Sequence, residues 1–489
     1  MITWGISANS HDAAVAVFDN DRLLFASHSE RFSGKKNDPD LCDNLVKYVT
    51  SKYGKPDEVV WYERPFVKTL RQLRAGQGFN HRSNDIRNYL RTYGITDTAI
   101  NYQWHHESHA AAGYYTSKFQ EAAIVVIDAI GEFETLTIWQ GEGTAMKKLY
   151  SQWYPDSLGL WYSAMTQRCH LKPNEEEYIL MGMAAYGDPE KLKDRIKQDF
   201  FKHSSKLVSF KRNLHRGCQD WAPELTINDT FDIAAATQAV YEEYFEKIVA
   251  QAKKLTGSDN LVIMGGCALN CLANPIAYKH FKNVWIMPNP GDAGSAVGAV
   301  LANRQQRITW DTCSLGYDIT PTSSTDEIVD YLDKNKMCGV AQGAAEFGPR
   351  ALGNRSLLAD PRGHDIKDTV NAIKRRQQFR PFAPVILEEM ADLYFDLPGA
   401  SSDNRYMQFI SRCRHPQLFP AVVHRDGTSR VQTVAKDGSR IRTILEQWYE
   451  LTGCPMLLNT SLNIKGQPMV NDTRDAEAFE HHYAVKVFK

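Results

Sequence analysis

Two copies of one strand pattern predict an α/β protein whose N-terminal domain is a duplicated ribonuclease-H-like core of the actin/hexokinase type. Short apolar runs separated by polar turns open the chain, as two consecutive β-hairpins do: residues 2–6, 13–18 and 22–27. The apolar run 122–127 ends on Asp128, and a further run, 136–139, follows a second polar turn. An acid-bearing hairpin therefore occurs twice, which is the pattern of a duplicated core.

The chain of 489 residues is too long for a single hydrophobic core and predicts two or three domains. A boundary is expected between 308 and 322, where Trp310, Pro321 and short polar runs show no period. We therefore expect a first domain at 1–312 and a second α/β domain at 313–489.

Composition disfavours several classes of protein. With 57 basic and 58 acidic residues, the chain indicates no polyanion-binding surface, so nucleic acid is not favoured as a partner. No apolar run approaches membrane-spanning length and Met1–Trp4 lacks a basic signal-peptide start, so no membrane partner is expected. The nine cysteines contain no CxxC pair, which argues against a disulfide framework or a cysteine zinc site and indicates a reducing cytoplasm.

The first hairpin turn, residues 7–12, places a base and an acid side by side, His11 and Asp12. In ribonuclease-H-like cores this turn approaches phosphate, so the pair is a candidate for catalysis. An ordinary Asx-turn explains the same residues equally well, since Asp and Asn favour turns.

The segment 103–115 predicts the first turns of a helix and carries two candidate metal ligands. His105 and His109 lie four residues apart, which puts both rings on one helix face where they can hold one ion. The alternative is a partly exposed histidine pair beside a packing face of small residues. Asp128 favours the metal-site interpretation, because a carboxylate at the carboxyl end of a buried strand lies where open α/β sheets bind ligands.

Two glycine-bearing segments extend this predicted site. Asp292 stands in a glycine-bounded turn at the start of a helix and supplies a further oxygen ligand, although an Asp there is also a good N-cap. Gly265 and Gly266 follow the buried strand 261–264, and together with Asn270 they are candidates to meet a phosphate or a base.

Basic and small polar side chains predict a phosphate site in the second domain. The basic residues stand among Gly, Pro and Phe rather than on a solvated charged face. Ordered guanidinium groups of this kind suit phosphates and carboxylates. The candidates, the last two at the end of a predicted strand, are Arg350, Lys374, Arg380, Ser461 and Asn463.

These motifs, in this order, resemble the NodU/CmcH/TobZ family of carbamoyltransferases over nearly the whole chain. The long motif Glu346–Ser356 is the most specific. Members of this family join a carbamoylation domain, similar to the tRNA threonylcarbamoyl transferases, to a YrdC-like domain. The other matching stretches are Ser10–Ala14, His105–His109, Asp128, Met181–Gly187, Gly265–Asn270, Gly291–Gly298, Arg380–Pro384, His424–Thr428 and Leu457–Asn463.

The resemblance implies that the second domain, 313–489, is YrdC-like and carries out the first of two steps. Carbamoyl phosphate and ATP, with Mg expected beside the ATP, give carbamoyl adenylate there. The basic groups neutralise the phosphates and hold both reactants in line. The residues carried over for this step are Lys374, Arg380, Ser461 and Arg350.

The resemblance implies that the second step takes place in the first domain, beside a metal. The carbamoyl group passes to a hydroxyl of a small-molecule, sugar or nucleoside acceptor, and His11 or Asp12 takes the hydroxyl proton. The implied metal is Fe(II), and the ligand types also suit Mn or Zn. The ligands carried over are His105, His109, Asp128 and Asp292.

The chain departs from the family pattern in ways that leave alternatives open. Ala344 stands where an Arg is usual, Ile179 where a Lys is usual, Ala129 where a Gly is usual and Leu462 where a Phe is usual. One alternative function is threonylcarbamoyl transfer to tRNA, and another is a nucleotide-binding module that has lost catalysis. Whether two chains pair as a homodimer also stays open.

Overall fold

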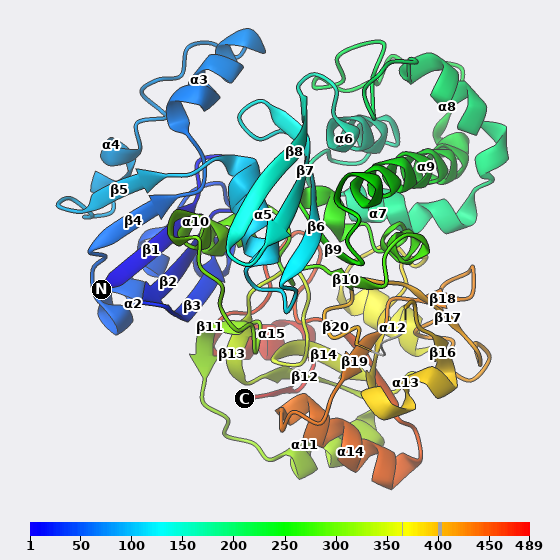
Figure 1. The fold of residues 1–489 in the computed structure, drawn as a ribbon. Coiled ribbons are helices and arrows are strands. Elements are labelled where there is room, and N and C mark those ends of the chain that lie inside the picture. Colours follow the sequence, from blue (N-terminus) through cyan, green and yellow to red (C-terminus); the bar gives the residue numbers. More distant parts are fainter. Residues whose placement is uncertain (364, 400–402) are drawn as a thin grey trace. The chain divides into compact units, whose positions relative to one another are not determined.

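The computed structural model describes residues 1–363, 365–399 and 403–489, which form two compact units (Figure 1). Unit 1 comprises Met1–Ser33 and Asn37–Asp311, and unit 2 comprises Gly34–Lys36 and Thr312–Lys489. The roles expected of the two domains stay predictions.

The first sheet of unit 1 contains the two hairpins expected at the N-terminus. Its strands are β1 Ile2–Ser7, β2 Ala14–Asp19, β3 Arg22–His28, β4 Glu58–Trp61 and β5 Ala99–Tyr102. Their order across the sheet is β3-β2-β1-β4-β5. β1 pairs antiparallel with β2 and parallel with β4.

The second sheet repeats this topology strand for strand. Its strands are β6 Glu121–Ile127, β7 Glu134–Glu142, β8 Ala145–Trp153, β9 Asn260–Met264 and β10 Asn283–Trp285. Their order is β10-β9-β6-β7-β8, and β6 pairs antiparallel with β7 and parallel with β9, as β1 does with β2 and β4. The predicted duplication of a ribonuclease-H-like core is therefore confirmed.

Two buried helices of unit 1, α5 (His105–Tyr114) and α10 (Ser295–Arg304), follow the last strand of the first and second sheet respectively. They pack closely because Gly298 has no side chain: a Cβ at that position would lie 1.9 Å from the carbonyl oxygen of Ser108. Gly113 lets α5 approach β9 in the same way, since a Cβ there would lie 2.5 Å from Val262. These contacts fix the position and rotation of α5.

The other helices of unit 1 surround the two sheets (Figure 1). The longest, α9, has 27 residues and packs against β6 and β7. These helices are α1 Glu30–Ser33, α2 Asp43–Tyr53, α3 Pro65–Arg74, α4 Ile86–Arg91, α6 Leu158–Arg168, α7 Glu177–Met183, α8 Lys193–Phe200 and α9 Thr230–Thr256.

Unit 2 is built on a six-stranded sheet made of β12 Met337–Ala341, β14 Arg355–Ala359, β15 Ala383–Leu387, β19 Gln432–Val434, β20 Met456–Ser461 and β21 Val487–Phe488. Their order is β19-β15-β20-β14-β12-β21. β20 lies between β15 and β14, antiparallel to both, and its residues Leu457 and Leu458 are in the core. A YrdC-like fold for this unit stays a prediction.

Smaller sheets and five helices complete unit 2. The strands are β11 Ser314–Ile319, β13 Gly343–Glu346, β16 Phe395–Asp396, β17 Ser411–Cys413 and β18 Thr428–Ser429. The helices are α11 Thr325–Asn335, α12 Ile366–Ile373, α13 Glu388–Tyr394, α14 Arg440–Thr452 and α15 Thr473–Tyr483.

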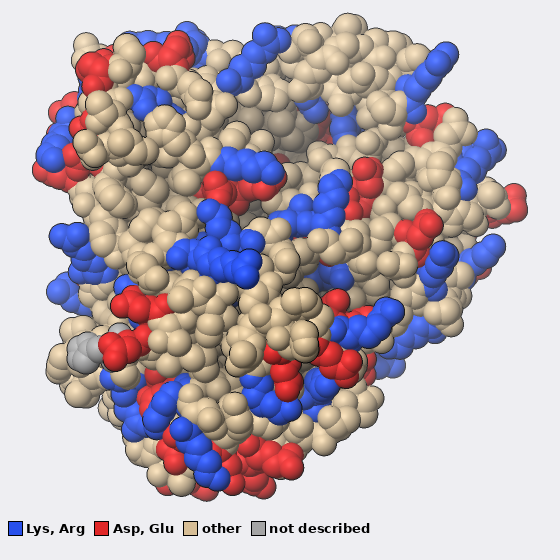
Figure 2. Space-filling model, turned by 180° about the vertical axis from the view of Figure 1, so that it is seen from behind, with Lys and Arg blue, Asp and Glu red and all other residues tan. Residues whose placement is uncertain are grey.

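The surface carries charges of both signs. Figure 2 shows Lys and Arg side chains interspersed with Asp and Glu over one face, as a formal net charge of −1 leads one to expect. Among the described residues, no helix combines the length and the apolar composition that crossing a membrane requires.

Candidate functional site

The histidine pair lies on α5, which is buried at every residue except Glu107. His105 is 1 % exposed and His109 0 %, so the alternative of a partly exposed pair is wrong. Small residues, Ala110–Ala112, let the neighbouring elements close over the helix. The two Nε2 atoms lie 3.1 Å apart on one face, as the four-residue spacing predicts.

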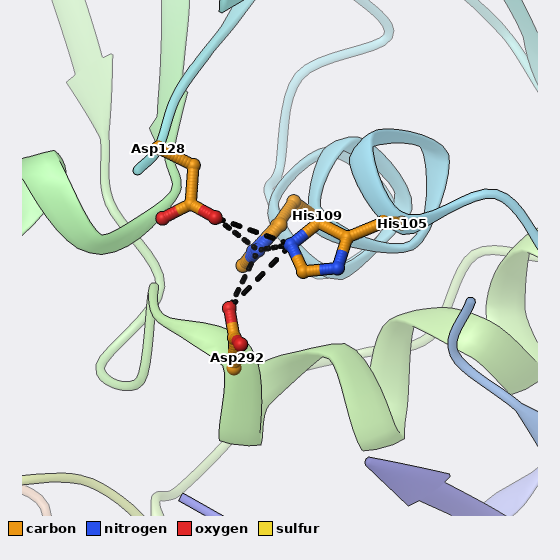
Figure 3. A group of neighbouring side chains, drawn as sticks. All are labelled: His105, His109, Asp128 and Asp292. Atoms are coloured by element: carbon orange, nitrogen blue, oxygen red, sulfur yellow. Dashed lines mark hydrogen bonds and ion pairs between the residues drawn. The ribbon is translucent and has the colours of Figure 1, made fainter. Parts of the chain in front are cut away.

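Two carboxylates approach this pair from other elements (Figure 3). Asp128 directly follows β6, and its Oδ2 lies 3.2 Å from Nε2 of His105. Asp292 opens the short helix η6 (Asp292–Gly294), and its Oδ1 lies 3.3 Å from Nε2 of His109 and 3.5 Å from that of His105. The N-cap of η6 is Gly291, so the alternative of Asp292 as a cap is wrong.

The four side chains have the donor types and the spacing of a divalent-cation site. One ligand atom from each residue lies within 4.8 Å of all the others. Two ring nitrogens at 3.1 Å repel each other unless a proton or a metal ion lies between them. The carboxylate oxygens around them stabilise either positive charge, and this mixture of nitrogen and oxygen ligands suits iron, manganese or zinc.

Without a metal, the site favours a proton. Burial by itself disfavours a charged imidazole, but Asp292 and Asp128 outweigh it and raise the pKa of His105 to about 10. Burial would also raise the pKa of the Asp128 carboxyl, but the histidines hold that pKa well below its usual range. His106 differs, because its burial lowers its pKa and its Nδ1 lies 3.0 Å from Oγ1 of Thr137.

Carboxylates outside the predicted set support His105. Glu132 accepts the backbone N–H of His105, with both oxygens at 3.2 Å. Glu63 lies with Oε2 4.0 Å from Nδ1 of His105, and its Oε1 accepts a hydrogen bond from Nζ of Lys68 at 2.6 Å. Glu63 lies just beyond the buried strand β4, the same signal that marked Asp128 beyond β6.

The first hairpin turn brings His11 and Asp12 together, with Nδ1 and Oδ2 3.0 Å apart. Asp12 has a φ of 51°, in the left-handed region where Asp is tolerated. Burial opposes the charge on His11, but the Asp12 hydrogen bond and the negative charges of Asp12 and Asp292 raise its pKa to about 9. The electrostatic influence of Asp292 links this pair to the candidate metal site.

The backbone amides of Gly265 and Gly266, predicted to meet a phosphate or a base, both donate hydrogen bonds within the fold. The N–H of Gly265 donates to the carbonyl oxygen of Pro290 at 2.9 Å, and that of Gly266 donates to Oδ1 of Asp128 at 3.0 Å. Gly266 therefore holds the Asp128 ligand, and a phosphate or base at this glycine pair stays a prediction.

Asn270, the third residue of that group, is also engaged within unit 1. Its side-chain amide exchanges two hydrogen bonds with the amide of Gln238, each 3.0 Å long, and the residue is buried. Its polar atoms bind α9 and the turn that follows β9, and a contact of Asn270 with a phosphate or a base stays a prediction.

Unit 2 brings together three of the residues predicted to hold phosphates. Nζ of Lys374 donates to the carbonyl oxygen and Oδ1 of Asn463, both at 2.9 Å, and to the carbonyl oxygen of Ser461 at 2.5 Å. Lys374 is buried, and this burial lowers its pKa well below the usual range. The positive charges of Arg376 and Arg380 lower the pKa of Lys374 further.

The loop that carries Arg350 is folded around a buried acid. Glu346 accepts the backbone N–H groups of Leu352 and Asn354 at 2.7 and 2.9 Å. Arg355 is 0 % exposed and donates to several backbone carbonyl oxygens, among them those of Gly343 and Asn471 at 3.0 Å. These contacts give the motif Glu346–Ser356 a defined conformation.

Comparison with known proteins decides the family. Residues 63–301 match the family described as Carbamoyltransferase N-terminus, and residues 329–488 match Carbamoyltransferase C-terminus. The chain belongs to the carbamoyltransferase family. The two matches together cover most of both units of this carbamoyltransferase, and the protein is a transferase.

Relatives match this carbamoyltransferase over most of their own length. An uncharacterised protein of Synechocystis is 31 % identical, over 96 % of this chain and 93 % of that protein. Nodulation protein NolO of Bradyrhizobium diazoefficiens is 32 % identical, over 76 % and 75 %. Nodulation protein NolNO of Sinorhizobium fredii is 29 % identical, over 95 % and 76 %.

Solved structures align with 62 % of this carbamoyltransferase. Component A of the Acidaminococcus fermentans (R)-2-hydroxyglutaryl-CoA dehydratase is 12 % identical over 99 % of that chain, with a TM-score of 0.35. The ROK hexokinase of Thermus thermophilus is 14 % identical over 97 %, with a TM-score of 0.32. Scores of this size carry no argument, so the fold class of unit 1 rests on its strand topology.

One residue that departs from the family pattern lies in the core. Ile179, at the position where a Lys is usual, is 1 % exposed on α7 and packs in the core of this carbamoyltransferase. A lysine at that position would place a charge among apolar side chains, which is costly unless the charge is paired.

Proposed function

We propose that this protein is an ATP-dependent O-carbamoyltransferase that works in two steps. One carbamoyl phosphate, one water and one ATP give carbamoyl adenylate, phosphate and pyrophosphate in unit 2. In unit 1 the adenylate carbamoylates a hydroxyl of a small-molecule acceptor, which releases AMP and one proton. The observation that carries the proposal is the convergence of two histidines and two aspartates in the N-terminal part of a carbamoyltransferase.

The cations of unit 2 suit the first step. ATP and carbamoyl phosphate bring several negative charges into one place, and fixed positive charges stabilise them without having to reorganise during the reaction. Lys374 is held in place by Ser461 and Asn463, and phosphate charges entering the site favour its protonated form, which burial alone disfavours. The guanidinium group of Arg380 adds planar donors that match phosphate oxygens.

The candidate metal site suits the second step. Fe(II) is the metal we propose, held by His105, His109, Asp128 and Asp292, and when bound it supplies Lewis-acid chemistry toward the carbamoyl carbonyl. His11 and Asp12 share a hydrogen bond, and Asp12 is the group we propose to receive the acceptor's hydroxyl proton, because a pKa raised to about 9 keeps the His11 imidazole protonated at neutral pH.

The test is to damage each unit separately. His109→Ala should still release phosphate and pyrophosphate from carbamoyl phosphate and ATP, but should fail to carbamoylate an acceptor. Lys374→Ala should fail in both assays, because the second step then receives no adenylate. Phosphate and pyrophosphate release are measured directly, and acceptor transfer is measured by mass spectrometry as a gain of about 43 Da over a panel of hydroxylated metabolites.

Matched surface variants control for unspecific damage. His203→Ala and Lys254→Ala change exposed side chains of the same types and should retain both activities. If the His109 variant, folded by circular dichroism, releases no phosphate, the division of labour between the two units is refuted. Wild-type protein that consumes carbamoyl phosphate but modifies no hydroxyl would instead limit the proposal to the first step.

A further inference from the structure

Helix α3 (Pro65–Arg74) turns charged side chains inward and apolar side chains toward solvent, the reverse of an ordinary surface helix. Its charged and polar residues Lys68 and Arg71 are buried. Phe66, Leu70 and Leu73, spaced so that they form one stripe along the helix, are 70 %, 40 % and 52 % exposed. A surface helix normally turns such a stripe toward the core. We call these three residues the α3 stripe.

The buried face fixes this orientation. Nζ of Lys68 donates to Oε1 of Glu63 at 2.6 Å and to the carbonyl oxygen of Asn9 at 2.7 Å. Nη1 of Arg71 donates to Oε1 of Gln77 at 2.8 Å. Turning the stripe inward would break these bonds and strand a buried carboxylate, which is strongly destabilising. The apolar face is therefore presented outward by the fold itself.

The chain around the stripe is basic. No acidic residue occurs from 64 to 84, and the exposed residues of this segment include Arg64, Arg74 and Arg82. Phe79, in the loop after the helix, is a further exposed aromatic residue at 54 %. Figure 1 shows α3 at the periphery of unit 1, on the side of the first sheet and beyond α4 and β5.

We propose that the α3 stripe and its basic surroundings dock on an anionic phospholipid surface. Leu and Phe side chains insert at the boundary between headgroups and acyl chains, while arginines bind the headgroup phosphates. A protruding element suits a flat bilayer better than a concave partner site. Self-association through this face is disfavoured, because a two-fold pair would bring the same arginines together with no acidic residue from this segment between them. Such docking requires no membrane-spanning helix, so the proposal departs from the expectation of no membrane partner, which rested on the lack of a spanning run and of a signal-peptide start.

Co-sedimentation with vesicles tests the proposal on the full-length protein. Wild-type protein should sediment with vesicles of phosphatidylcholine and phosphatidylserine, and much less with vesicles of phosphatidylcholine alone. The triple variant Phe66→Ser, Leu70→Ser, Leu73→Ser should lose this binding. The variant Arg74→Gln, Arg82→Gln should bind about fivefold more weakly for each arginine removed, since each basic group near an anionic surface contributes about that factor.

The control replaces an apolar residue of similar exposure elsewhere. Ile227→Ser, at a side chain 63 % exposed on the far-separated segment before α9, should bind as wild type does. Circular dichroism checks that every variant is folded. If the triple variant does not fold, the arginine variant still tests the proposal. Light scattering in solution measures the mass of the same proteins.

Several results would overturn the proposal. Absence of binding to anionic vesicles, equal binding to neutral vesicles, or undiminished binding by the triple variant each contradicts it. A wild-type dimer that the triple variant converts to a monomer assigns the stripe to a second copy of this chain instead.

Discussion

The affinity of the metal-free protein for a divalent metal should rise steeply with pH. Nε2 of His105 lies 3.1 Å from Nε2 of His109, and 3.2 and 3.5 Å from oxygens of Asp128 and Asp292. Burial disfavours an imidazolium there, but the two aspartates raise the pKa of His105 to about 10. The metal-free site therefore holds one proton at neutral pH, and a metal ion must displace it.

The size of the effect follows from that pKa. When binding displaces one proton, the apparent affinity rises about tenfold for each pH unit below the pKa of the group. Between pH 7 and pH 9 we expect about a hundredfold gain. The bound proton also stabilises the metal-free fold, because the folded pKa of His105 is above its ordinary value of 6.5. This stabilisation is complete below pH 6.5 and is lost as the pH rises toward 10.

Isothermal calorimetry with Mn(II) measures both quantities. Titrations in two buffers of different ionisation enthalpy count the protons released, which should be about one per metal near pH 8. Asp292→Asn removes the carboxylate that raises the pKa most and should flatten the pH dependence, whereas Asp311→Asn, outside the site, should not change it. An affinity that stays within a factor of two from pH 7 to pH 9 in the wild type refutes the reasoning.

Three further predictions concern other residues. Glu63→Gln should lower metal affinity by about tenfold at most, because it removes a negative charge 4.0 Å from Nδ1 of His105, a distance too long for a hydrogen bond, and an unchanged affinity by calorimetry would exclude that role. Arg380→Ala should slow pyrophosphate release about a hundredfold, and Arg380→Lys should restore it only in part; normal release by the alanine variant would mean that the phosphate site is misassigned. Arg355→Met should lower the free energy of unfolding by about 2–5 kcal/mol, measured by urea denaturation, because each buried carbonyl oxygen left without its donor costs about 1–3 kcal/mol, and a loss below about 1 kcal/mol would contradict this.

The sequence predicted the parts of the site that depend on local spacing. The repeated hairpin with its acid indicated the duplicated core, and strand pairing bears this out. The four-residue interval between His105 and His109 placed both rings on one helix face whatever the surroundings. The order of the basic residues in the second half indicated a cation cluster, and Lys374 does lie against Ser461 and Asn463.

Local spacing could not decide which of two roles a side chain takes when both suit its position. Asp292 is as good a cap as a ligand by sequence, and only the close approach of α10 to α5 at Gly298 brings it to the histidines. Gly266 and Asn270 carry groups that could meet a phosphate, and in the fold Asp128 and Gln238 bind these groups. The two residues of each pair are more than thirty positions apart in sequence, so no local pattern contains them.

The sequence by itself determined the elements and the chemical types at the site, because periodicity fixes which side chains share a face. Only the tertiary structure decided which way each face turns. The apolar spacing of Phe66, Leu70 and Leu73 indicates a face directed toward a core. In the fold that face points outward, because Lys68 on the opposite side binds Glu63 and the carbonyl oxygen of Asn9, and a buried ion pair of this kind cannot be given up without a large loss of free energy.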